Sequence, residues 1–291
     1  MMKEEQVRMS NVAGDFRILR KGHENQSMPE AHYHPYYEVG YMKSGESKIF
    51  VNHTLYRMKT GDMIFVRPLE IHRVTEYAKG INERFSINFS EKFLQILRQE
   101  CGEEALQKLF SNVKLTIPTG RREYVEDLLR KMEFASNQPD EYTELLRKLY
   151  LFELLIFAGR YGALDLYVDQ LSMEENSTEQ AIQKAAAFIC QNYEKSIMLD
   201  DMAKMVHMSP TYFSRKFKKV TGLGFKEYLN QVRIKEASLL LLKSDASVTE
   251  IACRCGFNDG NYFGDAFRKA KGISPGQYRK SPEFLSASAL Q

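Results

Sequence analysis

The sequence has few cysteines and no long hydrophobic segment. Four scattered cysteines in 291 residues are too few for a disulfide framework. The first ten residues, MMKEEQVRMS, contain no apolar core, so we expect no secretory signal. The longest apolar stretch, residues 149–159, is interrupted by Glu153 and is too short to cross a bilayer. These features predict a soluble protein, with no membrane partner, in a reducing cytoplasm.

The composition is that of an ordinary globular protein. Hydrophobic residues make up 43% of the chain and charged residues 27%, which provides apolar material for more than one core. The length predicts about two domains. Disordered, collagen-like and disulfide-scaffold proteins are excluded.

Positive charge is concentrated in the last third of the chain. Residues 1–177 contain 24 Lys and Arg against 27 Asp and Glu, whereas residues 178–291 contain 17 against 11. The net charge of +3 therefore arises entirely from the C-terminal part. This asymmetry indicates either an anionic partner, such as a nucleic acid or a membrane surface, or only a solvated basic surface.

The first ninety residues alternate between apolar and polar side chains, which is typical of half-buried strands. The expected strands cover residues 37–42, 48–51, 55–58, 62–66 and 83–89. Short turns separate them, so we expect an antiparallel sandwich or barrel.

After Ser90 the period changes to 3.6 residues, which indicates helices. The segment at about 143–161 is apolar around much of its circumference, so it is either buried or shared with a second copy. We expect residues 90–161 to form a homodimer, because a small barrel offers little surface to cover them. A polar run then predicts a linker, which divides the chain into residues 1–168, 169–177 and 178–291.

The C-terminal third repeats itself with an offset of 50 residues. The paired segments are Tyr212-Phe213 with Tyr262-Phe263, Phe217-Lys218 with Phe267-Arg268, Gly222 with Gly272, and Tyr228 with Tyr278. Each copy predicts a helix-turn-helix unit, at residues 199–220 and 248–271. The phenylalanines lie four residues apart, so we expect them to pack inside each unit rather than to stack on bases.

Capping residues mark the expected helix starts. Ser209 precedes Pro210, Ser247 opens a capping box, and Asn258 or Asp259 caps the last of these helices. A segment at about 225–243 joins the units. At about 1.5 Å per residue it forms a rod of about 28 Å, close to the spacing of about 34 Å between successive major grooves.

The outer face of the second helix in the first unit carries side chains that suit DNA. Arg215 can grip guanine with two hydrogen bonds, and Thr211 and Ser214 can contact either base edge. Lys218 and Lys219 suit phosphates. The alternative is a solvated helix face.

The matching face of the second unit is poorer in such residues. Asn261 can read adenine, whereas Asp265 can accept from cytosine but repels phosphates. The basic residues that remain for the DNA backbone are Arg268, Lys269 and Lys271. We therefore expect this unit to anchor the protein more than it specifies the sequence.

The second unit carries one long motif, made of the segments Ile251-Ala252, Gly256-Phe257-Asn258-Asp259, Tyr262-Phe263, Phe267-Arg268-Lys269, Gly272-Ile273-Ser274-Pro275 and Tyr278-Arg279. With this motif, residues 180–280 resemble the tandem helix-turn-helix domain of the AraC family of bacterial transcription regulators. The resemblance implies binding to double-stranded DNA, contact with RNA polymerase and no catalysis. At Gly264-Asp265 the family more often has a small polar residue and then a basic or polar one.

The N-terminal part resembles the two cupin motifs that AraC-type regulators place before the DNA-binding domain. The first motif contains His32, His34, Glu38 and Gly45, and the second, looser one ends at His72. Two positions apart on a strand, His32 and His34 point to one face, and Glu38 falls on that face too. Such a group has the donors to hold a transition metal. Sensors of this family instead usually bind small organic effectors without a metal, so we expect no cofactor. The third alternative is a plain structural role for these side chains.

The resemblance therefore predicts a multidomain α and β protein. A cupin-like antiparallel β-barrel with a helical dimerisation segment precedes an all-α tandem helix-turn-helix domain. The residues that we expect to contact the effector are His32, His34, Glu38, Tyr41 and His72. Polar groups among tyrosines would suit a hydroxylated ligand such as a sugar, by analogy with the family.

The sequence predicts a DNA-binding transcription regulator in which the effector shifts the population of domain arrangements. It does not choose between an activator and a repressor. Two alternatives stay open: a metal-dependent cupin enzyme fused to a DNA-binding module, and a regulator without an effector.

Overall fold

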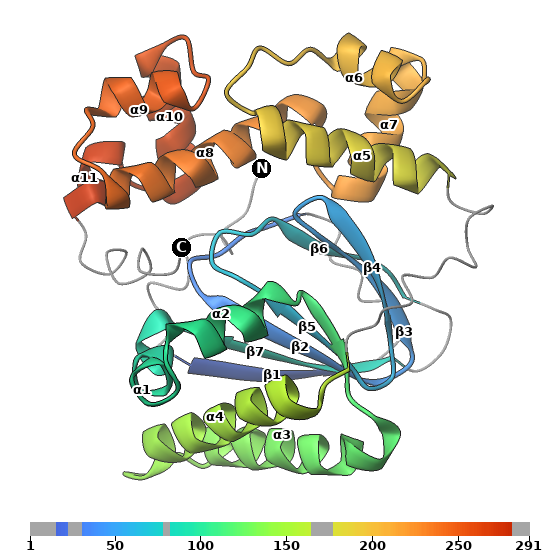
Figure 1. Ribbon diagram of the computed structural model, residues 1–291, viewed down its shortest axis with the longest axis vertical. Coiled ribbons are helices and arrows are strands. Elements are labelled where there is room, and N and C mark those ends of the chain that lie inside the picture. The colour runs from blue at the N-terminus through green and yellow to red at the C-terminus, as the bar shows by residue number, and fades with distance from the viewer. Residues whose placement is uncertain (1–15, 23–30, 78–81, 164–176, 281–291) are drawn as a thin grey trace.

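The computed structural model describes residues 16–22, 31–77, 82–163 and 177–280. Figure 1 shows a β-sheet domain with its own helices, and above it a layer of helices formed by the chain from residue 177 onward. Among the described helices, none has the length and apolar character needed to cross a membrane.

The strands of the described residues form two antiparallel sheets. One has the order β1-β7-β2-β5-β8 and the other has the order β4-β3-β6. Their bounds are β1 Phe16–Gly22, β2 Tyr37–Ser44, β3 Glu46–Val51, β4 Thr54–Lys59, β5 Asp62–Val66, β6 His72–Tyr77, β7 Glu83–Phe89 and β8 Lys114–Thr116. The five strands expected from the alternation are present, and β1, β6 and β8 are additional.

The expected closed barrel is wrong for the described residues. β8 pairs with β5 from Asp62 to Ile64, so both edges of β5 are used within the larger sheet. No ladder joins the two sheets among the described residues, and the isolated bridge of His72 in β6 is to His32, which lies in neither sheet. Apolar side chains from both sheets pack between them.

Alternation along each strand divides the side chains between two cores. The side chains between the two sheets are Met42, Ile49, Val51, Met58, Ile64, Val66 and Val74. The opposite face of the larger sheet, with Val39 and Phe65, packs against the helices that follow it. These helices are α1 Glu91–Cys101, α2 Glu103–Ser111, α3 Arg122–Asn137 and α4 Thr143–Tyr161, with a 3-10 turn η2 at Thr119–Arg121.

The C-terminal helices form two cores joined by one helix. Their bounds are α5 Ser177–Asn192, α6 Leu199–Met205, α7 Pro210–Thr221, α8 Phe225–Lys243, α9 Val248–Arg254, α10 Gly260–Lys271 and α11 Pro275–Lys280. The first half of α8, including Tyr228, packs with α5, α6 and α7, and its second half, including Leu241, packs with α9, α10 and α11. Of the expected linker, residues 169–176 lie outside the described residues, and Ser177 is the first residue of α5.

Candidate functional site

The second helix of each helix-turn-helix unit, α7 or α10, is built in the same way. The Ser209 hydroxyl accepts from the Tyr212 amide at the start of α7, and the Asp259 carboxylate accepts from the Asn261 amide at 2.7 Å at the start of α10. Both helices end at a glycine in the left-handed region, Gly222 with φ 84° and Gly272 with φ 77°. The inner faces carry fully buried phenylalanines at positions 213, 217, 263 and 267.

The outer faces of α7 and α10 are open to solvent. On α7 the side chains of Thr211, Arg215, Lys218 and Lys219 are exposed and that of Ser214 is half-buried. On α10 the exposed side chains include those of Asn261, Asp265, Arg268 and Lys269. The Asp265 carboxylate lies 3.9 Å from the Arg268 guanidinium, so it offsets part of the positive charge there. The eight residues expected to contact DNA therefore lie on the open sides of these two helices.

The sheet domain contacts the C-terminal ends of both helices. The Arg73 guanidinium donates to the backbone oxygen of Lys219 at 3.2 Å, at the end of α7. The Tyr33 hydroxyl donates to the backbone oxygen of Ala270 at 2.7 Å, at the end of α10. The Lys271 ammonium lies 4.7 Å from the centre of the Tyr33 ring, so it faces the sheet domain rather than a DNA backbone. Further contacts bind α8, whose Tyr228 hydroxyl donates to the backbone oxygen of Asn52.

Three imidazoles and a carboxylate meet at the end of the sheet domain that faces these helices. The side chains of His32, His34 and His72 each place a ring nitrogen within 4.8 Å of the others. The Glu38 carboxylate lies 3.1 Å from His34 Nε2 and 3.6 Å from His72 Nε2. We call these four residues the imidazole cluster. The structure thus brings together four of the five residues that were expected to contact the effector.

The Glu38 carboxylate is held in its ionised form. Burial would raise the pKa of Glu38, but the hydrogen bond from His34 and the charges of His34 and His72 outweigh it and hold that pKa well below its ordinary value. Ser86 Oγ and Asn88 Nδ2 also donate to this carboxylate, each at 3.0 Å. Burial lowers the pKa of His34, against the opposing influence of Glu38.

One nitrogen in the imidazole cluster makes no hydrogen bond. His72 Nδ1 lies 2.9 Å from the backbone oxygen of Glu70, so Nδ1 carries a proton, and Nε2 lies 3.6 Å from the Glu38 carboxylate. His72 is 2% exposed, and its Nε2 has no hydrogen-bond partner among the described residues. A buried ring nitrogen that makes no hydrogen bond, beside two other imidazoles, is a polar group that a ligand can contact.

Tyr41 lies apart from the imidazole cluster. It points to the opposite face of β2, where its side chain is 1% exposed and its hydroxyl donates to Glu126 Oε1 at 3.2 Å. Tyr41 therefore cannot join a ligand held by the other four expected residues.

The comparisons with known proteins cover both parts of the chain. A model of an AraC-like ligand binding domain matches residues 13–155, and a model of a helix-turn-helix domain matches residues 202–281. The chain belongs to the AraC family of transcription regulators.

Several relatives of this AraC-family regulator align over most of their length. The HTH-type transcriptional activator RhaS of Klebsiella pneumoniae is 26% identical over 267 residues, covering 89% of this chain and 91% of that protein. The Msm operon regulatory protein of Streptococcus mutans is 29% identical over 257 residues, covering 84% of each. Among solved structures, ToxT from Vibrio cholerae covers 92% of this chain and 98% of its own, with 15% identity and a TM-score of 0.36.

This AraC-family protein is a DNA-binding transcription regulator with a ligand-binding domain, and it is not an enzyme. The enzyme alternative is therefore overturned by the family match.

Proposed function

We propose that this AraC-family regulator is a homodimer that places α7 and α10 of each copy in successive major grooves of its operator. The observation that carries the proposal is the matched construction of the two helices, each with a capped start, a buried aromatic face and an exposed polar face. They flank α8, whose 19 residues span about 28 Å. That length is of the order of the groove spacing of about 34 Å.

We assign sequence reading mainly to α7 and anchoring mainly to α10. The open side of α7 carries Arg215, Thr211 and Ser214 next to two lysines, a set that can contact base edges and phosphates. The open side of α10 offers Asn261 for base contact, with Arg268 and Lys269 for phosphates. The Asp265 carboxylate weakens phosphate binding there.

Arg215→Ala is the direct test of base reading. Losing a bidentate contact to guanine should weaken binding to the cognate operator by about 1–3 kcal/mol and relax preference at one base pair. Operator selection from a random DNA pool, followed by titration of cognate and scrambled duplexes, measures both effects. Equal losses on the two duplexes would refute the reading role of Arg215.

Lys218→Ala provides the matched contrast on the same face of α7. A lost phosphate contact should weaken all sequences to a similar extent and flatten the salt dependence of binding by about one unit of slope. The Lys218 backbone oxygen near Arg73 is untouched by this change. A loss confined to the cognate duplex would instead make Lys218 a base reader.

We propose that a small-molecule effector acts through the imidazole cluster. The cluster offers His34, Glu38 and the Nε2 of His72 to a hydroxylated ligand such as a sugar. Sequence neighbours of the cluster histidines contact the helices. Tyr33 lies between His32 and His34 and contacts the end of α10, and Arg73 follows His72 and contacts the end of α7. A ligand that shifts these strands would shift both helix-turn-helix units at once, which favours one domain arrangement.

A divalent transition metal is the second candidate for the imidazole cluster. The Nε2 of His72, together with two imidazoles and a carboxylate, is a donor set that such metals accept. Metal analysis of the purified protein and of His72→Gln decides between the two. Stoichiometric metal in the parent protein that is lost in His72→Gln supports a metal site. If neither protein contains metal, and a compound from a sugar and metabolite panel raises the melting temperature of the parent, the result supports an organic effector.

The contact between Lys271 and the sheet domain should make stability depend on pH. Burial lowers the pKa of Lys271 to about 7, from an ordinary value of 10.5. The unfolded chain therefore binds more protons between these values, and stability rises with pH through this window. Lys271→Met removes the buried charge, so it should stabilise the protein by about 2 kcal/mol at pH 7 relative to its effect at pH 9.

Urea unfolding of the variant and the parent protein at pH 7, 8 and 9 measures this difference. Lys269→Met serves as the control, because Lys269 is exposed on the same turn of α10. A stability difference between Lys271→Met and the parent that does not change with pH would show that Lys271 stays charged in the folded protein.

We further propose that the protein acts in the cytoplasm as an activator that contacts RNA polymerase. Relatives named transcriptional activators support this, RhaS among them. The cysteines at positions 101, 190, 253 and 255 are all free thiols, which suits a reducing compartment.

A further inference from the structure

Tyr262, in the first turn of α10, is a large aromatic side chain that the fold leaves open to solvent. It is 53% exposed, whereas Phe263 and Phe267 of the same helix are buried. Asn261 and Lys269, which lie near it on the outer side of α10, are exposed as well. Tyr262 therefore belongs to the side of α10 that is proposed to meet DNA.

The first helix-turn-helix unit has a tyrosine at the same place. Tyr212 precedes Tyr262 by 50 residues and is 37% exposed. Residues 211–219 and 261–269 also share one order of buried, half-buried and exposed side chains. Because Tyr212 lies one turn before Arg215, the repeated position is next to the residues that are expected to contact DNA.

The Tyr262 side chain is held at its ring and at its hydroxyl. Asn230 Nδ2, on α8, donates to the Tyr262 hydroxyl at 2.7 Å. The centre of the Tyr262 ring lies 6.1 Å from that of Phe257, whose side chain is buried. An exposed side chain that is already fixed at both ends loses little further freedom when it binds a partner.

The hydrogen bond from Asn230 leaves the proton of the Tyr262 hydroxyl available. A phenol oxygen can accept a hydrogen bond while its own proton is donated elsewhere. The Tyr262 hydroxyl donates to none of the described residues, so its proton can go to an acceptor outside the chain. Phosphate oxygens of DNA are acceptors that tyrosine hydroxyls contact.

We propose, on the basis that α10 binds DNA as proposed above, that Tyr262 donates a hydrogen bond to a phosphate of the DNA backbone and that Asn230 positions it. The anchoring by α10 then comes from a neutral donor as well as from Arg268 and Lys269, whose charge Asp265 partly offsets. Since the backbone carries a phosphate at every base, this contact holds the protein without reading the sequence.

Tyr262→Phe is the direct test, because it removes the hydroxyl and keeps the ring beside Phe257. Binding of the full chain to a duplex of mixed sequence should weaken by about tenfold, the usual loss for a hydrogen bond to a charged group. The salt dependence should keep its slope, since a neutral hydroxyl releases no counterion. Tyr142→Phe, at an exposed tyrosine of the sheet domain, should change neither. Unchanged affinity in Tyr262→Phe overturns the proposal.

Asn230→Ala tests the positioning role in the same titration. Alone, it should weaken binding by up to about tenfold, because the hydroxyl is no longer held in place. In a protein that already carries Tyr262→Phe it should add nothing, since the group that it positions is gone. Unchanged binding in the single variant, or additive losses in the double variant, would overturn the role of Asn230.

Lys269→Ala tests the binding of α10 to DNA independently of Tyr262. Loss of its phosphate contact should weaken binding and flatten the salt dependence by about one unit of slope. A loss with Lys269→Ala but not with Tyr262→Phe overturns the contact of Tyr262 alone. Unchanged binding in both variants overturns the proposed binding of α10 to DNA as well.

Discussion

Replacing Leu149 with Glu should convert the proposed dimer to a monomer and weaken its binding to an operator with two half-sites by about 100-fold to 10,000-fold. The loss is large because a dimer binds its second half-site within an already formed complex. A monomer must pay the full cost of association at each half-site. DNA binding at a single half-site should change little.

The reason for choosing Leu149 is an apolar stripe on the outside of α4. Leu145, Leu149 and Ile156 are 57%, 51% and 51% exposed and share one side of the helix, whereas Leu151 and Leu155 on its other side are buried. Large apolar side chains exposed together on one helix face are typical of an interaction surface. In Figure 1, α3 and α4 lie on the side of the sheet domain opposite the helix-turn-helix units, so an interface there leaves DNA binding free.

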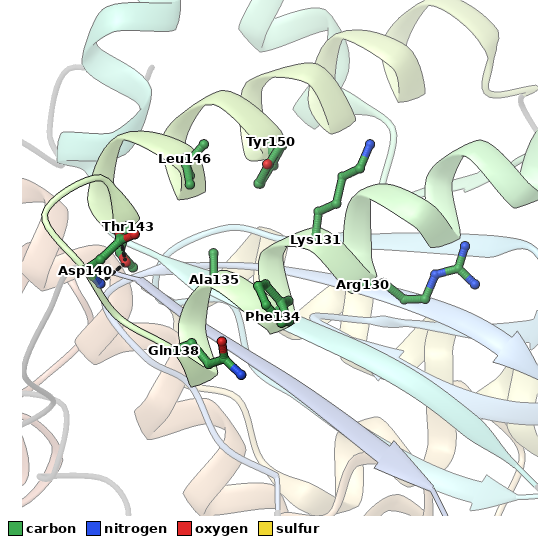
Figure 2. Close-up of a pocket in the computed structure, with 9 residues that line it drawn as sticks. All are labelled: Arg130, Lys131, Phe134, Ala135, Gln138, Asp140, Thr143, Leu146 and Tyr150. Carbon is green, nitrogen blue, oxygen red and sulfur yellow. Dashed lines mark hydrogen bonds between the residues drawn. The ribbon is translucent and has the colours of Figure 1, made fainter.

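A groove beside this stripe extends the same surface. Figure 2 shows it between α3 and α4, with the Phe134 ring on one wall and Leu146 and Tyr150 on the other. Its volume is about 380 Å³, and Phe134 is 63% exposed. Apolar side chains of a second copy would fill this groove. A glutamate at position 149 would instead place its charge in an apolar interface between the copies.

Sedimentation velocity and titration with one-site and two-site duplexes measure the outcome. Lys108→Gln, at an exposed position on α2, changes the net charge by the same amount outside this face. Far-UV circular dichroism should show unchanged helix content for both variants, because both positions are exposed. If Leu149→Glu stays dimeric at micromolar concentration, the interface lies elsewhere.

Local sequence signals were sufficient to predict the helix starts and the two helix-turn-helix units of the C-terminal domain. α7 and α9 begin at Pro210 and Val248, each directly after the capping residue identified from the sequence. α10 begins directly after Asp259, the second of its two candidate caps. A cap and a turn depend only on neighbouring residues, so the offset of 50 located both units. The open sheets depend instead on β8, which pairs with a strand about fifty residues earlier, and a run of three residues gave no signal for it.

The residues of the candidate sites could be placed from the sequence only where local spacing decides their position. His32, His34 and Glu38 meet because even spacing on an extended chain gives one face. Tyr41 is an odd number of residues from Glu38, so the same rule predicts the opposite face, and applying it would have separated the two. Lys271 could not be placed from sequence, because its surroundings come from the sheet domain about 240 residues earlier.

Phe217→Ala should destabilise the first helix-turn-helix unit by about 3–5 kcal/mol, the usual cost of deleting a buried aromatic ring. The Phe217 side chain is fully buried, and its ring centre lies 5.3 Å from those of Phe213 and Tyr228. Phe50 of the sheet domain belongs to the same core, so the deletion also loosens the contact between the domains. The melting temperature and the affinity for the operator should therefore both fall in this variant.

Phe267→Ala is the matched variant in the second unit, where the ring is equally buried and lies 5.3 Å from that of Tyr278. We expect a destabilisation of similar size, but confined to the unit that anchors the protein. Operator binding should then weaken on cognate and random duplexes alike, whereas Phe217→Ala should remove the preference for the cognate duplex. Variants that remain fully stable yet lose DNA affinity would mean that these rings stack on bases, which their burial in the folded protein argues against.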